Sequence, residues 1–308
     1  MDNKMTNTQK YLTYCEFQKG LDAKTIKAYK IDLQQYDDYC CTCKCETEKE
    51  YICGFIESMH NRCKPKTIKR KIAVLKAFYG FLLREDFIEA NPFDKIDTKI
   101  REPKILPKVI PQKLLIKILN EAYKSLATCE SEYSLKCTLR DIAVLELLFA
   151  TGLRISELCH LKNSDVNLSE NYVKIFGKGS KERIVQFSIP DVISALKEYR
   201  RHFKNDIEKT GYFFVNKLSH RLSEQSVRFM VNKYTNRAAA RLHITPHMFR
   251  HTFATMLLES DVDIRFIQQI LGHSSITTTE IYTHVSAAKQ KQILKRKHPR
   301  NKLNINKG

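Results

Sequence analysis

One tyrosine, Tyr282, lies between two histidines in the stretch LGHSSITTTEIYTHV, residues 271–285. A phenol has an ordinary pKa near ~10 and is a weak nucleophile at neutral pH. It could attack an electrophile only with a base beside it and with cations that stabilise the developing charge. The alternative is a packed aromatic ring. Thr277 and Glu280 form an S/T-x-x-E capping box, which predicts a short helix that holds Tyr282 in its first turns.

Two segments next to glycines offer cations. Arg154 follows a glycine turn in ATGLRISEL, at the start of a predicted helix. Its guanidinium could bind a phosphate through two parallel hydrogen bonds, or it could pair with Glu157 on the same helix. Lys178 lies in GKG, where a hairpin tip could enter a groove and reach an oxygen. It could equally be a solvated turn lysine, and Lys174 and Lys181 lie close by as substitutes.

The run HMFRH supplies an imidazole and a second arginine. His247 and Arg250 are three residues apart, which places them on one face of a helix. His247 and His251 are four apart, a spacing that imitates half of a zinc site. Met248 stands where the zinc metalloprotease motif requires glutamate, so a base beside an arginine is the better interpretation.

A second imidazole comes from Leu271-Gly272-His273. Gly272 is expected to end a helix, so that His273 projects from the corner nine residues before Tyr282. A tight turn could bring both into one site, or each histidine could be a partly buried ring with its own partner. Taken together, the candidates comprise a hydroxyl, two arginines, two imidazoles and a lysine, without a carboxylate pair or a metal-ligand set. This combination suits attack on a phosphodiester.

The elements that must position these residues are mostly helical. Apolar residues at spacings of three and four, with capping residues and prolines at helix starts, predict helices at 22–43, 65–84, 191–208, 223–242 and 263–271, and another from Pro246. Two β-rich runs in 171–189 flank GKGSK, which predicts a hairpin. We therefore expect a mainly α protein with a small β-sheet. Its expected parts are a helical domain at 1–95, a basic proline-containing linker at 96–111, an α+β domain at 112–285 and a basic tail at 286–308.

The 308 residues include 53 basic and 34 acidic side chains, a formal net charge of +19. Such an excess favours a polyanionic partner, but it does not by itself distinguish nucleic acid from an anionic membrane surface. The helix at 65–84 opens with basic residues that either face solvent or contact DNA. These residues are Lys66, Lys69, Arg70 and Lys71.

Ten cysteines and a polar first segment, MDNKMTNTQK, predict a cytoplasmic protein with reduced thiols, no signal peptide and no membrane span. Four of the cysteines form the run CCTCKC, residues 40–45. The run lacks the paired C-x2-C spacing of structural zinc sites, and a helix end with half-buried thiols is the simpler interpretation. We expect no metal.

The motifs together resemble a tyrosine recombinase of the compact Xer-like integrase type. ATGLRISEL, GKGSKER, HMFRHTFAT, IQQILGHSS and TTEIYTH follow one another in the order of that family. KTIKAYKIDL and KTIKRKIAVLKAFYGFLL, followed by NPF, are similar to its helical core-binding domain, and HPR near residue 298 is similar to the end of Xer proteins. The resemblance covers roughly residues 10–300.

The resemblance implies a role for each candidate. Arg154 and Arg250 would clamp the scissile phosphate, and His273 would hydrogen-bond to it. His247 would take the proton from Tyr282, which would attack and hold the 3′ phosphate covalently.

Two further residues receive roles in the same way. Lys178 would act as general acid toward the leaving 5′ oxygen, and Glu157 would support the arrangement of the site. The implied enzyme uses no cofactor and acts on double-stranded DNA as a homotetramer that brings two sites together through a Holliday junction, with its basic tail docked on a neighbouring subunit. We expect association with the nucleoid. The resemblance leaves open chromosome or plasmid dimer resolution or integration of a mobile element, and a need for a partner recombinase or DNA translocase.

Overall fold

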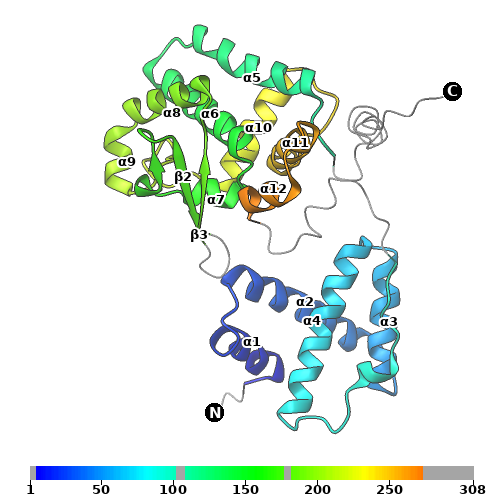
Figure 1. The fold of residues 1–308 in the computed structure, drawn as a ribbon. Helices are drawn as coiled ribbons and strands as arrows, with labels where there is room; N and C mark the ends of the chain where they lie inside the picture. Colours follow the sequence, from blue (N-terminus) through cyan, green and yellow to red (C-terminus); the bar gives the residue numbers. More distant parts are fainter. Residues whose placement is uncertain (1–4, 102–107, 177–181, 273–308) are drawn as a thin grey trace, which may run out of the picture. The chain divides into compact units, whose positions relative to one another are not determined.

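The computed structural model describes residues 5–101, 108–176 and 182–272. The chain divides into two compact units, Met1–Lys104 and Ile105–Gly308. Each unit encloses an apolar core of its own. The described residues are mainly helical with one small antiparallel sheet, so the predicted fold class is confirmed (Figure 1). No helix in these ranges is both long and apolar enough to cross a membrane.

The first unit is built from helices. These are α1 (Asn7–Phe17), α2 (Ala23–Thr42), α3 (Glu48–His60), α4 (Pro65–Arg84) and the 3-10 turn η1 (Pro92–Lys95). Asp22 caps α2 as expected, because its side chain accepts a hydrogen bond from the backbone N–H of Thr25 at 2.9 Å. The helix predicted at 65–84 forms with those bounds, and Pro65 opens it.

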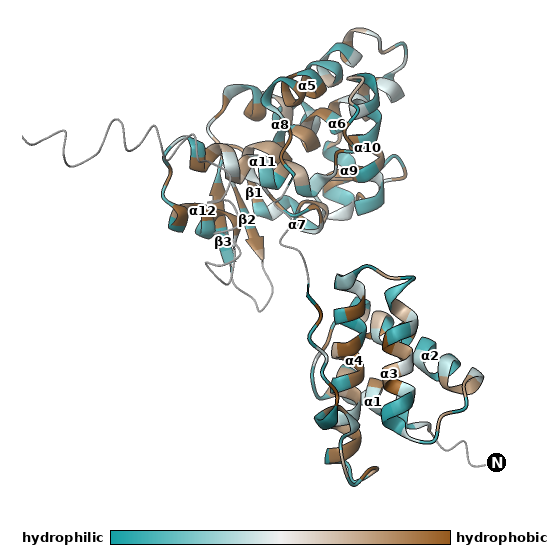
Figure 2. Cartoon of the chain, turned by 90° about the vertical axis from the view of Figure 1, so that its right-hand side faces the viewer, coloured by the Kyte–Doolittle hydropathy of each residue, from teal (hydrophilic) through white to brown (hydrophobic). Residues whose placement is uncertain are grey.

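Helix α4 packs against each of the other three helices of the first unit. The apolar stripe expected from its sequence is buried, with Ile68, Ile72 and Leu75 each no more than 4% exposed. In Figure 2 brown apolar residues alternate with teal polar ones around α4, as one buried face requires. Tyr79, on the same face, shares a hydrogen bond with Tyr36 of α2 at 2.9 Å.

The CCTCKC run lies at the end of α2, as the helix-end interpretation predicts. The helix stops at Thr42, and Cys43 follows it in an extended conformation. Cys41 is exposed, whereas Cys40, Cys43 and Cys45 are half-buried. Within the described ranges, no three histidine, cysteine or acidic side chains gather closely enough to hold a metal ion.

The second unit combines a group of helices with one small sheet. Its elements are α5 (Gln112–Ala127), α6 (Glu132–Thr151), α7 (Ile155–His160), η2 (Asn163–Asp165), β1 (Val166–Asn167), β2 (Tyr172–Phe176), β3 (Glu182–Gln186), α8 (Pro190–His202), α9 (Lys204–Thr210), α10 (Glu224–Arg237), α11 (Pro246–Glu259) and α12 (Ile264–Leu271). Helix α6 carries most of its buried residues in the run TLRDIAVLELLFA, and it packs against α5, α8 and α11. Gly152 ends it with a left-handed φ of 61°.

The predicted hairpin is present in its two strands. Strands β2 and β3 pair antiparallel, with Lys174 opposite Ile184 and Phe176 opposite Glu182. The residues between them, 177–181, lie outside the described residues. The sequence did not reveal β1, which pairs with β2 through only two residues and is too short to carry a periodic signal.

Two helices differ from the prediction in the second unit. The segment expected as one helix at 191–208 is two, because the chain bends at Phe203, whose buried ring lies 4.8 Å from that of Tyr199. Helix α10 ends at Arg237, before the expected residue 242. Two residues after this end, Ala239 adopts a left-handed φ of 51°, which a right-handed helix cannot include. The sequence alone favoured a longer helix because alanine has a high helix propensity.

Candidate active site

Arg154 is the N-cap residue of α7 and follows the left-handed turn at Gly152. Its backbone N–H donates to Glu157 Oε2 and its Nη1 to Glu157 Oε1, both at 2.8 Å. The pairing with Glu157, one of the two alternatives for Arg154, is therefore present. The side chain nevertheless remains 38% exposed, so that a phosphate could still reach it.

Arg250 lies on α11 and is only 5% exposed. Its Nη1 donates to the carbonyl oxygen of Gly152 at 2.7 Å, and its Nη2 donates to that of Leu271 at 2.5 Å. Arg154 Nη2 reaches the next carbonyl, that of Gly272, at 3.5 Å. The structure therefore brings the two arginines together at one corner, the end of α12, although 96 positions separate them in the sequence.

His247 lies in the first turn of α11, next to these arginines. Its pKa is lowered by partial desolvation and then by the positive charges of Arg250, Arg228 and Arg154. The ring is consequently neutral at pH 7, the form that can accept a proton. His251, one turn further along, also has a lowered pKa because it is desolvated and lies near His247.

Arg183, on β3, is a member of this site to which the sequence assigned no role. Its Nη1 and Nη2 donate to the two oxygens of Glu157, at 3.0 and 2.7 Å, and its Nε donates to the carbonyl oxygen of Ile270 at 2.9 Å. The only sequence signal was its place at the end of GKGSKER. Helix α12 lies beside β3 and against α11, which explains how three separate segments meet here (Figure 1).

Glu157 is the carboxylate at the centre of the arginines and is 8% exposed in its side chain. Burial alone would raise its pKa, but the hydrogen bonds from Arg183 and Arg154 outweigh burial and lower it. Glu157 is thus ionised at neutral pH. Its supporting role remains a proposal, and its position between Arg154 and Arg183 favours that role.

Three expected catalytic residues lie outside the described residues. They are Lys178, His273 and Tyr282. The described chain ends at Gly272, which directly precedes His273 in the sequence. The predicted capping box at Thr277 and Glu280 lies outside it as well.

The basic start of α4 divides into two groups. Lys66 and Lys69 are exposed, so the DNA contact expected of them stays a prediction. Lys71 is only 5% exposed, and its Nζ donates to Asp32 Oδ1 at 2.9 Å and also to Gln35. Arg70 also pairs with Asp32, while its side chain stays 47% exposed.

The expectation that Lys71 faces DNA needs correction. Asp32 is 2% exposed, and a buried carboxylate is stable only with a cation beside it. Lys71, on α4, supplies this cation to Asp32, on the adjacent helix α2. The sequence shows the lysine but not the carboxylate that lies opposite it.

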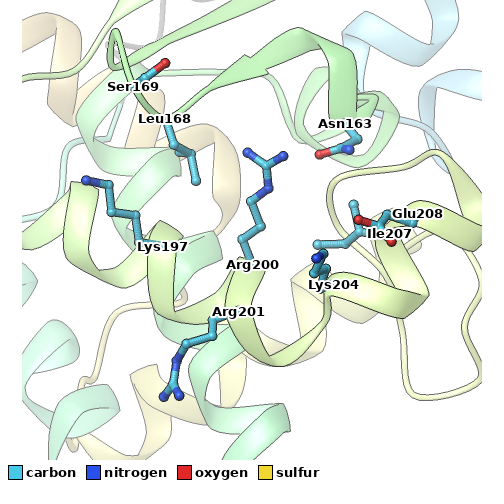
Figure 3. A pocket seen from close by; sticks show the side chains of 9 residues that line it. All are labelled: Asn163, Leu168, Ser169, Lys197, Arg200, Arg201, Lys204, Ile207 and Glu208. Carbon is cyan, nitrogen blue, oxygen red and sulfur yellow. The ribbon is translucent and has the colours of Figure 1, made fainter.

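A cavity of about 440 Å³ lies elsewhere in the second unit, between α8, α9 and the β1–β2 turn (Figure 3). Arg200 points into it from α8, whereas Arg201 points away. Lys197 and Lys204 add positive charge and Glu208 adds one negative charge. Among the described candidate catalytic residues, Arg154, His247 and Arg250, none lines this cavity, so it is separate from the arginine site.

Comparisons with known proteins agree with the fold. The family model "Phage integrase family" matches residues 118–289, and "Phage integrase, N-terminal SAM-like domain" matches residues 8–86. A tyrosine recombinase of Agathobacter rectalis is 52% identical over 301 residues, which cover 97% of this chain and 98% of that protein. The tyrosine recombinase XerC of Thermodesulfovibrio yellowstonii is 36% identical over 314 residues, covering 97% and 99%.

Solved structures share the fold. XerH recombinase, in a post-cleavage complex with palindromic difH substrate, matches with a TM-score of 0.75 and 22% identity over 94% of this chain and 84% of that one. A lambda integrase tetramer bound to a Holliday junction matches with a TM-score of 0.67 and 16% identity over 88% and 77%. The chain belongs to the phage integrase family. It is a tyrosine recombinase of the Xer-like group, a metal-independent class of DNA strand-transferring enzymes, and the resemblance seen in the sequence is confirmed.

Proposed function

We propose that this chain is a site-specific DNA recombinase that cuts and rejoins strands through a covalent link between Tyr282 and a 3′ phosphate. The observation that carries the proposal is the meeting of Arg154 and Arg250 at the end of α12. Two guanidinium groups at one corner form a ready site for a phosphodiester, since each can donate two hydrogen bonds to phosphate oxygens. The sequence places His273 directly after that corner.

The proposed cleavage step is a displacement at phosphorus. The Oη of Tyr282 forms a bond to the phosphorus atom, and the bond from phosphorus to the 5′ oxygen breaks. His247, neutral because of its lowered pKa, takes the phenolic proton. Lys178 gives a proton to the departing 5′ oxygen. Arg154, Arg250 and His273 stabilise the charge that develops on the remaining phosphate oxygens.

Rejoining is the same step in reverse. The phosphotyrosyl ester conserves the energy of the broken phosphodiester, so a 5′ hydroxyl from another strand can attack it without ATP. The reaction balances without a metal ion or another cofactor, because the cations that stabilise the charge are side chains of the protein.

The proposed assembly is a homotetramer on two double-stranded DNA sites that passes through a Holliday junction. In this proposal the first unit contacts DNA through the exposed basic start of α4, and residues 112–285 carry the chemistry. The tail at 286–308 docks on a neighbouring subunit, and 96–111 link the two domains. A protein that recombines double-stranded DNA in this way would be associated with the nucleoid. The lambda integrase tetramer, which shares the fold, supports this arrangement.

The nucleophile can be tested with the full-length protein and sheared genomic DNA from its source. Detergent would trap covalent complexes, and sequencing the attached DNA would identify the cut site. We expect an adduct with the wild-type protein and none with Tyr282→Phe, while both bind the recovered site in a gel shift. An adduct at the wild-type level with Tyr282→Phe would refute the assignment of the nucleophile. Binding with no adduct in either protein would indicate a DNA-binding protein without the chemistry.

The same preparation separates a recombinase from an enzyme that only relaxes DNA. Plasmids with two copies of the recovered site should give recombinant products, and plasmids without the site should stay supercoiled. Relaxation that ignores sequence would contradict the proposed function.

A further inference from the structure

Arg183 uses every nitrogen of its guanidinium inside the site. Nη1 and Nη2 bind the two oxygens of Glu157, and Nε binds the carbonyl oxygen of Ile270. Its side chain is 12% exposed, so water competes little for these bonds. Such a bidentate contact fixes both the position and the orientation of the carboxylate.

The contact extends to Arg154 through Glu157. Each carboxylate oxygen receives one bond from Arg183 and one from Arg154. One negative charge thus lies between two positive charges, and the group as a whole keeps a net charge of +1. Without Arg183, Glu157 and Arg154 alone would form a neutral pair, and Arg154 would have less attraction for a phosphate.

The contact also extends to the end of α12. The carbonyl oxygens of three consecutive residues, Ile270, Leu271 and Gly272, receive bonds from Arg183, Arg250 and Arg154, in that order. Gly272 leaves room for this arrangement. A Cβ added to it would lie 2.7 Å from Arg183 Nη1, and its φ of 63° already favours glycine.

We propose that Arg183 is a positioning residue for strand cleavage: it offsets the charge of Glu157 and holds it in place, so that Arg154 presents an undiminished positive charge to the scissile phosphate. This inference rests on the proposed function, because it concerns the same reaction. Arg183 itself touches neither the phosphate nor the nucleophile in this scheme. Its contribution passes through Glu157 and through the end of α12.

The test compares Arg183→Met and Arg183→Lys in the full-length protein. The matched control is Arg201→Met, which removes an exposed arginine of α8 that pairs with Glu198. The substrate is a nicked duplex with the site recovered from wild-type adducts, and the readouts are the single-turnover rate of adduct formation, the Kd for the duplex and the thermal unfolding midpoint. We expect Arg183→Met to slow adduct formation about 10- to 100-fold, since a small misplacement of a catalytic group costs about that much. The Kd should change by less than about threefold.

A purely structural contact would not give a rate loss that depends on Glu157. We therefore add Glu157→Gln and the double variant. When position 157 carries no charge, the loss of Arg183 should cost little further, so the double variant should cleave about as fast as Glu157→Gln. Arg183→Lys, which keeps the charge but not the paired bonds, should fall between wild type and Arg183→Met. If Arg183→Met fails to unfold cooperatively, Arg183→Lys and the double variant carry the test.

Two results would overturn the inference. One is a wild-type cleavage rate in Arg183→Met, and the other is the same fold loss whether residue 157 is Glu or Gln. Either result, in a preparation whose wild type forms a Tyr282-dependent adduct, leaves the proposed function intact. Absence of any adduct with the wild-type protein would instead defeat both.

Discussion

Arg250 donates a hydrogen bond from Nη2 to the carbonyl oxygen of Leu271 at 2.5 Å and so joins the start of α11 to the end of α12. The same guanidinium reaches back to Gly152, which ends α6. One buried side chain therefore ties together three helix ends, two of which lead directly to other candidate catalytic residues. Substitution of Arg250 should consequently affect both the chemistry and the stability of the second unit.

For Arg250→Ala we expect adduct formation to fall by about 10²–10³-fold, as for the loss of other groups placed to stabilise developing charge. Unfolding should also require less free energy, by roughly 1–3 kcal/mol, because buried carbonyl oxygens lose their donors. Trapped-adduct kinetics and chemical denaturation measure the two effects separately. Arg201→Met provides the control, and a stable Arg250→Ala that cleaves at the wild-type rate would contradict the role of the arginine.

The lowered pKa of His247 predicts the pH dependence of cleavage. A general base acts only when it is unprotonated, so the rate should rise with pH through a midpoint below the ordinary histidine value of about 6.5. DNA kept below its Kd ensures that the midpoint reports the free enzyme. His247→Gln should lower the rate and remove this rising limb, whereas the exposed His243→Gln should keep it. An unchanged limb in His247→Gln would assign the titration to another group.

Lys66 and Lys71 should behave differently although both lie at the start of α4. Lys66→Ala removes an exposed cation, so DNA affinity should fall and the slope of log K against log salt should lessen by about 1. Lys71→Met removes a partner of the buried Asp32, so the main effect should be on stability. The cost should stay below the ~3–5 kcal/mol typical of a broken buried pair, because Arg70 still contacts Asp32. Fluorescence anisotropy at several salt concentrations measures the DNA affinity, and thermal unfolding measures the stability. A loss of stability with Lys66→Ala and a loss of affinity with Lys71→Met would contradict this assignment.

Glu146 on α6 offers a prediction about stability and pH. It is 7% exposed, accepts a hydrogen bond from Tyr123 at 2.9 Å, and has a pKa raised mainly by burial. A raised folded-state pKa means that its stabilising contribution is full below the unfolded pKa of about 4.3 and is lost as pH rises through the folded value. Glu146→Gln keeps an acceptor for Tyr123 without the charge.

At pH 7 the Glu146→Gln variant should therefore unfold at a higher temperature than the wild type, by about 2–4 °C for each kcal/mol gained. The difference should shrink as pH falls toward 4. Differential scanning calorimetry across this range measures it. A variant that is less stable than the wild type at pH 7 would show that the ionised carboxylate is favourable in its site.

The sequence predicted the elements whose apolar pattern is local and regular. Helix α4 has its expected bounds because Pro65 fixes its start and a continuous apolar stripe follows. The end of α10 was missed because alanine favours helix, whereas the chain turns there through Ala239. Local propensity also could not show the bend at Phe203, which depends on how a buried ring packs.

The site was predictable as a set of residue types but not as a network. Arg154, Arg250 and His247 carry motifs that indicate phosphodiester chemistry, and the structure brings them together. Arg183 was missed because its partners lie 26 and 87 residues away in the sequence. Lys71 was expected at the surface because its partner is also distant in the sequence: Asp32 lies 39 residues before it.

The three carbonyl oxygens at the end of α12 are main-chain atoms, which determines which amino-acid substitutions this segment tolerates. Replacing the side chains of Ile270 or Leu271 with others of similar bulk removes no acceptor, so the arginines keep their partners whatever residue is there. Gly272 is the exception, because any side chain at this position meets Arg183. Random mutagenesis should therefore find that positions 270 and 271 accept apolar replacements of similar bulk, directly beside one position at which almost nothing is accepted.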